Sequence, residues 1–166
     1  MGADRPKPRL AVVSSLYPPH LGGVERYTAS LARALSARYT VDVFCLNTER
    51  QPAEIVDGGV TVRCLPCIPA FGGRFPLPTI GALRALEGWI DRLAPSAAIV
   101  QTRLYPLNAF AVRTFAKRRI PTLTIEHGTG YIDFRSAACN SLWRLYERLL
   151  AGVNEEIGRA SCRERV

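Results

Sequence analysis

The sequence has no long apolar run that could serve as a membrane span or as the core of an export signal. Its first nine residues are polar and basic, and the apolar stretch after them, Leu10–Val13, is only four residues long. A transmembrane helix needs about 20 apolar residues and the core of a signal peptide about 7 to 15. We therefore expect a cytoplasmic protein whose five cysteines are reduced.

Motifs that would hold a metal ion or a dinucleotide are also missing. Cys64 and Cys67 form a C-x-x-C, but no second pair completes a zinc site, and the pair follows a predicted strand rather than opening a thioredoxin-type helix. The sequence contains neither Asp-x-Asp nor G-x-G-x-x-G. We therefore predict structural or incidental cysteines, no metal site and no cofactor.

The net charge of +8 comes from basic residues spread along the chain rather than from one cluster. No RNA-stacking aromatic motif, recognition helix or zinc finger accompanies this charge, so nucleic acid is not expected as a partner. Two explanations remain open. The basic residues either form a solvated surface that keeps the protein soluble, or they contact anionic lipid at the inner face of a membrane.

Short apolar segments alternate with segments of helical periodicity along the chain. The predicted strands are 9–14, 40–46, 60–65, 97–101 and 121–125, and the predicted helices are 24–37, 80–93 and 107–117, with a further helical periodicity over 141–150. The apolar residues that recur at helical spacing in the first helix and predict its buried face are Val24, Tyr27, Leu31, Ala34 and Leu35. A proline-rich loop, 66–78, is long enough to be functional. Helices between strands imply right-handed crossovers, so the pattern predicts an α/β fold with a Rossmann-like, doubly wound parallel sheet.

Ligands of such sheets bind at the carboxyl ends of the strands. The segments that leave those ends are 14–23, the loop after Leu65, 102–105 and 126–131. They contain a glycine pair, an arginine, tyrosines and both histidines of the chain. We expect them to converge on one edge of the sheet.

The glycine pair Gly22-Gly23 joins the first strand to the first helix. Backbone without Cβ atoms can approach a ligand closely, and the unpaired N–H groups of a helix start favour an anion. Glu25 follows in the first turn, where the helix dipole favours an acidic residue. A tight turn is the alternative explanation of the glycines, but the setting predicts a cradle for phosphate or sugar.

The amino-acid sequence of this loop resembles that of a known family. The segment Tyr17-Pro-Pro-His-Leu-Gly-Gly-Val-Glu25 between a strand and a helix resembles the opening of family 4 glycosyltransferases, retaining enzymes of the two-domain GT-B fold. The matching glycines of that family line the donor cleft close to the diphosphate and the transferred sugar. The resemblance extends over about residues 9–151 and implies that Gly22 and Gly23 bind substrate here.

A second motif of the resemblance contains His127. Thr124-Ile-Glu-His-Gly-Thr129 resembles the segment whose histidine contacts the donor sugar beside the reacting carbon. The resemblance therefore implies that His127 is catalytic, orienting the sugar and stabilising charge in the transition state, and that Gly128 and Thr129 bind substrate. A structural histidine is the alternative.

Three more residues are candidate substrate contacts. Arg103 stands close to a point where many relatives carry a histidine, and its guanidinium could bind a phosphate of the acceptor. A surface salt bridge is the alternative. Tyr17 and Tyr105 could stack on a sugar ring, although core packing explains an aromatic residue near a strand end as well.

The chain has room for one sizeable core, whereas a GT-B enzyme needs two domains. The resemblance implies that residues 1–156 form the amino-terminal, acceptor-side half of a GT-B glycosyltransferase, without the carboxyl-terminal donor domain. Residues 157–166 lose the apolar periodicity and resemble translated vector or adapter sequence, so we expect a non-native tail. A native basic tail is the alternative.

The implied function of the whole enzyme is retaining transfer of a hexose from a nucleotide-sugar to a cell-surface polysaccharide or glycolipid. Its partners would be the nucleotide-sugar donor and a glycan or lipid-linked acceptor. The fragment alone is expected to be inactive, because catalysis needs both domains closed on the donor. A function from another class also stays open, namely a non-catalytic doubly wound module that binds a small anion or a partner protein.

Overall fold

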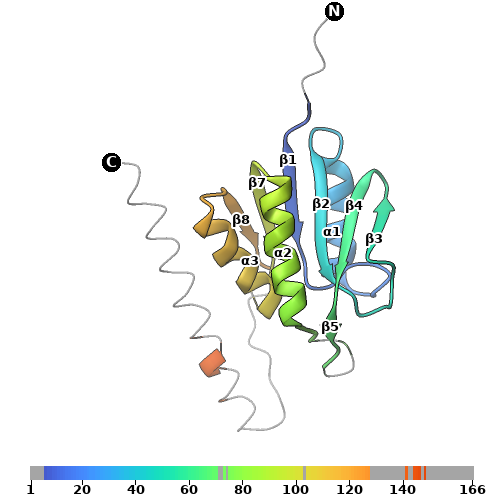
Figure 1. Cartoon of the computed structure of the whole chain (residues 1–166). Coiled ribbons are helices and arrows are strands. Elements are labelled where there is room, and N and C mark those ends of the chain that lie inside the picture. Colours follow the sequence, from blue (N-terminus) through green and yellow to red (C-terminus); the bar gives the residue numbers. More distant parts are fainter. Residues whose placement is uncertain are drawn as a thin grey trace, which may run out of the picture. The chain divides into compact units, whose positions relative to one another are not determined.

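The computed structural model describes residues 6–70, 73, 75–102, 104–127, 141, 144–146 and 148. The chain divides into two compact units, residues 1–125 and 126–166. The first unit contains a sheet flanked by helices (Figure 1). It holds every candidate site residue before Glu126.

The elements of the first unit follow the predicted alternation. The strands are β1 (Arg9–Val13), β2 (Thr40–Leu46), β3 (Glu54–Asp57), β4 (Val60–Leu65), β5 (Cys67–Ile68), β6 (Leu77–Pro78), β7 (Ala97–Gln101) and β8 (Thr122–Ile125). The helices are α1 (Gly23–Leu35), α2 (Ile80–Leu93) and α3 (Pro106–Lys117). All five predicted strands and all three predicted helices are confirmed, with small shifts at their ends.

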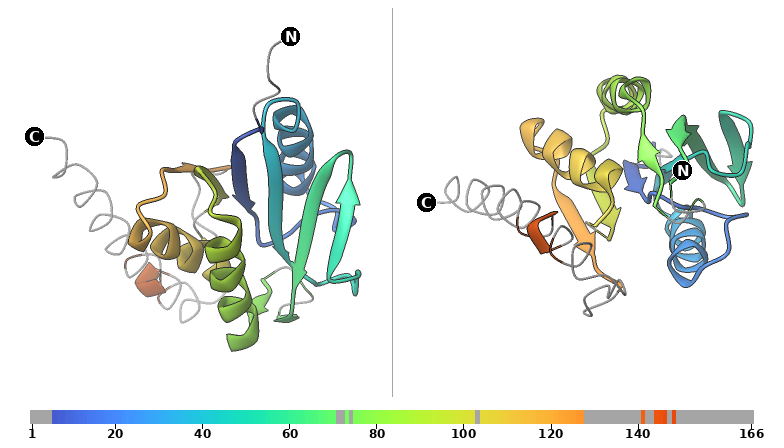
Figure 2. Two further views of the ribbon diagram at one scale, coloured as in Figure 1. Left: turned by 45° about the horizontal axis from the view of Figure 1, so that its top comes forward. Right: turned by 90° about the horizontal axis from the view of Figure 1, so that it is seen from below.

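The main sheet has the strand order β3-β4-β2-β1-β7-β8. β1 pairs in parallel with β2 and β7, and the pairs β2–β4 and β7–β8 are parallel too. Figure 2 shows α1 on one face of this sheet and α2 and α3 on the other. The predicted α/β, Rossmann-like, doubly wound fold is therefore confirmed.

Three short strands were not predicted from the sequence. The edge strand β3 runs antiparallel to β4, and Gly58 and Gly59 connect the two with φ angles of 57° and 83°. Glycine adopts these angles without the steric cost that a Cβ atom brings. Within the proline-rich loop, β5 and β6 form a two-residue antiparallel ladder. Strands this short leave too little alternation in the sequence to be recognised.

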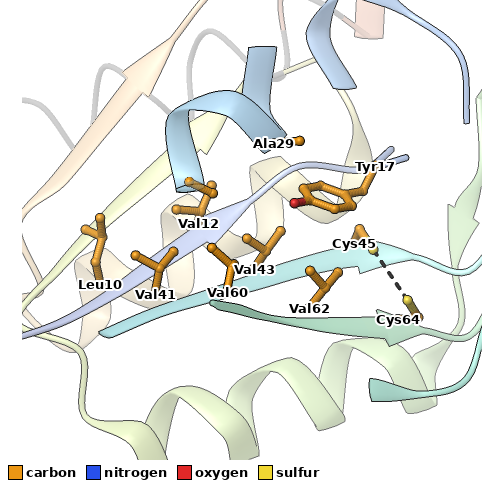
Figure 3. Packing of buried hydrophobic residues seen from close by; sticks show 11 residues of the cluster. Leu10, Val12, Tyr17, Ala29, Val41, Val43, Cys45, Val60, Val62 and Cys64 are labelled. Atoms are coloured by element: carbon orange, nitrogen blue, oxygen red, sulfur yellow. Dashed lines mark hydrogen bonds between the residues drawn. The ribbon is translucent and has the colours of Figure 1, made fainter. Parts of the chain in front are cut away.

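One face of the sheet and α1 enclose an apolar cluster (Figure 3). Its strand residues are Leu10, Val12, Val41, Val43, Cys45, Val60, Val62 and Cys64. Cys45 donates its S–H to Cys64 across neighbouring strands, with 3.8 Å between the Sγ atoms. This contact and burial raise the pKa of Cys45. Cys64 therefore interacts with the adjacent strand, which fits the structural role predicted for the cysteines.

The buried face of α1 differs from the predicted one. Glu25, Thr28, Ala29 and Ala32 face the sheet, whereas Tyr27, predicted on the apolar face, is exposed. Residues spaced by three and four positions share a helix face, and the two alanines let the helix lie close to the sheet. The spacing of larger apolar residues was thus a misleading guide to this face.

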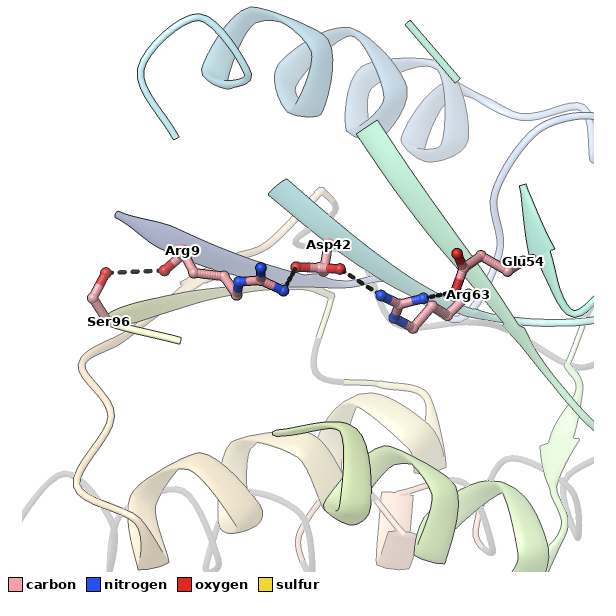
Figure 4. A network of polar contacts seen from close by, with 5 residues as sticks. All are labelled: Arg9, Asp42, Glu54, Arg63 and Ser96. Carbon is pink, nitrogen blue, oxygen red and sulfur yellow. Dashed lines mark hydrogen bonds and ion pairs between the residues drawn. The ribbon is translucent and has the colours of Figure 1, made fainter. Parts of the chain in front are cut away.

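The opposite face of the sheet contains an ionic network centred on the buried residues Asp42 and Arg63 (Figure 4). Arg63 of β4 donates to Asp42 of β2 at 2.9 Å and also contacts Glu54, while Arg9 of β1 reaches Asp42 at 3.3 Å. The Arg63 guanidinium lies 3.9 Å from the ring centroid of Trp89 on α2. Arg63 is thus buried and paired, and it adds nothing to the basic surface.

The second unit is described at only a few residues. Residues 141, 144–146 and 148 are helical, as the periodicity of 141–150 predicts. Burial raises the pKa of Tyr146 to about 12. The predicted boundary at residue 156 and the tail that follows it lie outside the described residues.

None of the helices in the described part is long and apolar enough to cross a membrane. The described side chains also include no group of three or more His, Cys, Asp or Glu residues arranged to hold a metal ion.

Candidate functional site

Strands β1 and β7 end side by side at the point where the strand order reverses. Val13 of β1 is in register with Val100 of β7, so the chain leaves both strands at the same edge of the sheet. From there it enters α1 on one face and α3 on the other (Figure 2). Open α/β sheets bind ligands at such a switch point. We call the described residues of 14–25 and 101–108 the switch-point edge.

A buried polar network joins the two sides of this edge. Ser15, which follows β1, donates to Asn108 Oδ1 at 3.0 Å. The Nδ2 of Asn108 donates to the carbonyl of Thr102 at 2.7 Å and also to that of Gln101. Ser15 and Asn108 are both buried. The network fixes the end of β7 against the end of β1.

Thr102 adopts a strained conformation at the end of β7. Its φ angle is 61°, in the left-handed region that a β-branched residue rarely occupies. Its hydroxyl is buried and has no hydrogen-bond partner within the described part of the chain. Its N–H continues the ladder by donating to the Ile125 carbonyl at 2.8 Å. Backbone strain of this kind concentrates at functional sites and costs about 1–3 kcal/mol.

The two glycines at the start of α1 have different surroundings. Gly22 is the N-cap, and a Cβ placed on it would lie 2.7 Å from Cδ and 2.9 Å from Oε1 of Glu25. A Cβ on Gly23 would meet no atom within 4 Å. The Glu25 carboxylate therefore lies against Gly22 and would have to shift to admit a Cβ, whereas Gly23 leaves open space.

Other polar groups surround Glu25. The His20 Nε2 is 4.0 Å from Glu25 Oε1, and the His20 Nδ1 is 3.1 Å from Glu49 Oε1. Burial and the nearby Glu25 both raise the pKa of Tyr105, the N-cap residue of α3. The Tyr105 ring stacks on Phe75 with 5.3 Å between centroids. Tyr105 therefore packs against Phe75, and the charge of Glu25 acts on its hydroxyl.

Tyr17 lies in the apolar cluster rather than on an open surface. Only 4% of the residue is exposed, and its hydroxyl donates to Asp57 Oδ2 at 3.0 Å. Asp57 is also bound by both oxygens to Arg33 of α1. Burial, followed by the hydrogen bond to Asp57, raises the pKa of Tyr17 well above its ordinary value. This placement fits the core-packing alternative for Tyr17.

The structure thus brings Gly22, Gly23 and Tyr105 to one edge of the first unit. Arg103, Gly128 and Thr129 lie outside the described residues. His127 is exposed and belongs to the second unit, two positions after β8 in the chain. The substrate-binding and catalytic roles of all these residues stay predictions.

Sequence reasoning missed the polar residues that build this edge. Ser15, Thr102 and Asn108 carry no motif, although a polar pair directly after an apolar strand and an asparagine in the first turn of a helix were visible signals. Glu25 was noted only for its position on the helix dipole. The burial of Glu25 depends on the path of the loop before α1, and the periodicity of the sequence does not predict that path.

Comparison with known proteins places this fold in a family. The chain matches the model of the glycosyl transferase 4-like domain over residues 22–153. No curated protein sequence matches it significantly. A sucrose-phosphate synthase from Thermosynechococcus elongatus has a similar structure, with a TM-score of 0.62 at 15% identity over 87% of this chain and 40% of that protein.

At this identity the structural likeness concerns the fold alone, which is similar to that of a GT-B glycosyltransferase. The chain spans 40% of the length of that synthase. The family match is a match of sequence and extends over most of the chain. It begins at the N-cap of α1 and includes β7, α3 and β8. The chain therefore belongs to the glycosyl transferase 4-like domain family.

Proposed function

We propose that this chain is the acceptor-side domain of a retaining glycosyltransferase that moves a hexose from a nucleotide-sugar to a cell-surface glycan or glycolipid acceptor. The observation that carries the proposal is the switch-point edge, where α1 and α3 both begin and Gly23 leaves open space for a ligand. Family membership supports sugar transfer. The donor, the acceptor and the stereochemistry are part of the proposal.

The residues of the edge suit the binding of a sugar. The bare backbone of Gly23 allows close approach, and Tyr105 presents a half-buried aromatic ring with a hydroxyl. We assign His127 to orient the donor sugar and to stabilise charge in the transition state, with Gly128 and Thr129 beside it. Protein cations would stabilise the leaving diphosphate without a metal ion, and Arg103 would bind a phosphate of the acceptor.

The proposal includes the domain organisation. Residues 1–156 would form the amino-terminal domain and residues 157–166 a non-native tail, while a second domain supplies most contacts to the nucleotide. The chain alone would bind nucleotide-sugars weakly and turn none over, because half a cleft leaves the ligand in contact with water. The protein would act in the cytoplasm, with basic side chains that contact anionic lipid.

NMR titration of the isolated chain with a panel of UDP- and GDP-sugars tests the proposal. The amide signals of Gly22, Gly23 and Tyr105 should shift together, with dissociation constants of about 1 mM or weaker. The free nucleosides serve as the control and should leave these three signals in place. Shifts confined to residues away from the switch-point edge would remove the site assignment.

The rival function, a non-catalytic module, makes a different prediction for the same chain fused to a donor domain of a relative. A transferase half should restore turnover of at least one nucleotide-sugar in that fusion. A binding module should bind its anion or protein partner equally well with and without the added domain. Turnover by the 166-residue chain alone would contradict the proposed need for a second domain.

A further inference from the structure

Three large apolar side chains of the first unit are exposed within one short stretch of the chain. Ile68 is 59% exposed, Leu77 39% and Ile80 71%. Ile68 of β5 and Leu77 of β6 are partners in the two-residue ladder, so their side chains lie on the same side of it. Ile80 is the first residue of α2 and follows β6 closely. We call Ile68, Leu77 and Ile80 the ladder patch.

Hydrogen bonds hold the ladder patch in place. The N–H and the hydroxyl of Thr79 both donate to the Pro66 carbonyl at 3.3 Å, and the same hydroxyl accepts from the Ala82 N–H at 3.1 Å. These bonds join the first turn of α2 to the residue before β5. The fold therefore presents the apolar side chains at fixed positions. Since apolar groups lose free energy in contact with water, a group of them fixed at the surface indicates an interaction site.

The ladder patch lies beyond the edge of the sheet that contains the candidate site. β4 runs parallel to β2 and ends at Leu65, so the ladder that follows it lies past the carboxyl ends of the strands (Figure 1). β1 and β7 end at the same edge. Phe75, between β5 and β6, stacks on Tyr105 of the switch-point edge. A partner that binds the ladder patch therefore lies next to the candidate site.

The charge around the ladder patch fits the surface of an anionic lipid bilayer. The sequence has no acidic residue between Asp57 and Glu87. Arg84 is exposed on α2, one turn after Ile80 and on the same side of the helix. Apolar side chains of such a surface enter the boundary between lipid headgroups and acyl chains, while a basic side chain beside them binds the lipid phosphates.

The backbone of the segment also suits lipid better than a protein partner. Residues 66–78 include four prolines, which have no N–H group, so fewer backbone donors lose water when the segment enters apolar surroundings. A specific protein interface needs about 20–30 residues on each side and about ten hydrogen bonds. A projecting ladder with three apolar side chains offers much less than this.

We propose that the ladder patch inserts into the interface of an anionic membrane and thereby brings the switch-point edge to a lipid-linked acceptor. The inference rests on the proposed function in one respect, that the acceptor binds at this edge. It narrows the acceptor from a glycan or a glycolipid to a glycolipid. Apolar insertion and attraction between charges act together, because a few inserted side chains alone bind a bilayer weakly.

Cosedimentation of the full chain with lipid vesicles tests the proposal. The vesicles contain equal parts of phosphatidylcholine and phosphatidylglycerol and are used at physiological ionic strength. The wild-type chain should bind them, and the triple variant Ile68→Ser, Leu77→Ser, Ile80→Ser should bind at least about tenfold more weakly. Arg84→Gln should weaken binding about fivefold. Vesicles of phosphatidylcholine alone should bind the wild type more weakly than the mixed vesicles do.

A matched variant controls for the loss of apolar surface in general. Val56→Ser combined with Leu123→Ser removes two side chains that are 76% and 59% exposed on the edge strands β3 and β8. This double variant should bind the vesicles as the wild type does. Urea unfolding of each variant shows that the chain remains folded, which is expected because every replaced side chain is exposed.

Two results would overturn the proposal. Equal vesicle binding by the wild type and the triple variant would assign the binding to basic side chains elsewhere on the surface. A wild-type chain that ignores the vesicles and instead forms dimers, which the triple variant loses, would assign the ladder patch to a second copy of the chain.

The result is separable from the proposed function because the vesicles carry no nucleotide-sugar. Vesicle binding through the ladder patch without any binding of nucleotide-sugars would uphold the membrane surface and reject the sugar transferase. Binding of nucleotide-sugars at the switch-point edge without vesicle binding would do the reverse and would favour a soluble glycan as the acceptor.

Discussion

The Ser15 hydroxyl donates a hydrogen bond of 3.0 Å to the side-chain oxygen of Asn108, a residue 93 positions later in the chain. This contact connects the segment after β1 to α3, and the amide nitrogen of Asn108 continues to the carbonyls of Gln101 and Thr102. The ends of the two central strands are thereby held at a fixed distance. The two halves of the candidate site depend on this one side chain.

A double-mutant cycle should detect this link. Asn108→Ala removes the acceptor of the Ser15 hydroxyl and the donor to two backbone carbonyls. We expect the free energy of unfolding to fall by about 2–4 kcal/mol. Ser15→Ala alone should cost about 1 kcal/mol, and the two changes should be non-additive by about that amount. Ser14→Ala is the control, since Ser14 bonds the nearby Leu16 carbonyl. Urea unfolding measures each value, and additive effects would contradict the network.

Replacing Thr102 by glycine should stabilise the chain and weaken its binding. Glycine adopts the left-handed φ of 61° without steric cost, so the free energy of unfolding should rise by about 1 kcal/mol. The loosened end of β7 should then bind nucleotide-sugars less tightly. Arg50→Gly is the matched control, with φ 53° in an exposed loop, and should stabilise without changing binding. A Thr102→Gly chain with unchanged stability would show that the conformation carries no strain.

The two glycines should respond differently to alanine. Gly23→Ala enters open space in a helix and should leave the stability equal or up to about 1 kcal/mol higher, while it weakens ligand binding. Gly22→Ala displaces the Glu25 carboxylate and should cost about 1 kcal/mol. That cost should disappear when Glu25 is also alanine. If it persists in the double variant, the carboxylate does not lie against Gly22.

Tyr17 should make the stability fall at high pH. An unfolded tyrosine titrates at about pH 10, whereas burial and Asp57 keep the folded Tyr17 protonated to higher pH. Above about pH 10 the unfolded state therefore binds fewer protons than the folded one, and the free energy of unfolding falls as pH rises, by up to about 1.4 kcal/mol per pH unit.

Tyr17→Phe should make this slope shallower by the same amount and cost about 1–2 kcal/mol at neutral pH, where it removes the hydrogen bond to Asp57. Urea unfolding from pH 9 to 11 compares the two chains. Identical slopes would mean that the Tyr17 hydroxyl titrates alike in both states.

His127→Ala tests the catalytic assignment in a full-length relative that carries this domain. If the imidazole contacts the sugar mainly as charge develops, kcat should fall by about 10² to 10³ with little change in donor affinity. A structural histidine would lower the melting temperature and leave the turnover of the folded fraction intact. Both quantities should be measured on one preparation.

The local pattern of apolar residues was sufficient to predict the longer strands and helices. The apolar run at Leu10–Val13 and the periodicity of α2 and α3 each reflect a few neighbouring residues, so they predict strands and helices without knowledge of the partners. Because alternating strands and helices allow few topologies, the parallel sheet and its binding edge followed as well. Gly22, Gly23 and Tyr105 were placed at that edge by this reasoning.

Only the tertiary structure decided which polar residues are buried and which partners they have. Arg63 and Asp42 come together because β2 and β4 are neighbours, Tyr17 reaches Asp57 because its loop folds back over the sheet, and Ser15 meets Asn108 at the switch point. Each contact joins residues that are distant in sequence, and each depends on strand order and crossover direction. Periodicity shows which side of an element is apolar, but the sequence does not state which polar side chain another element will cover.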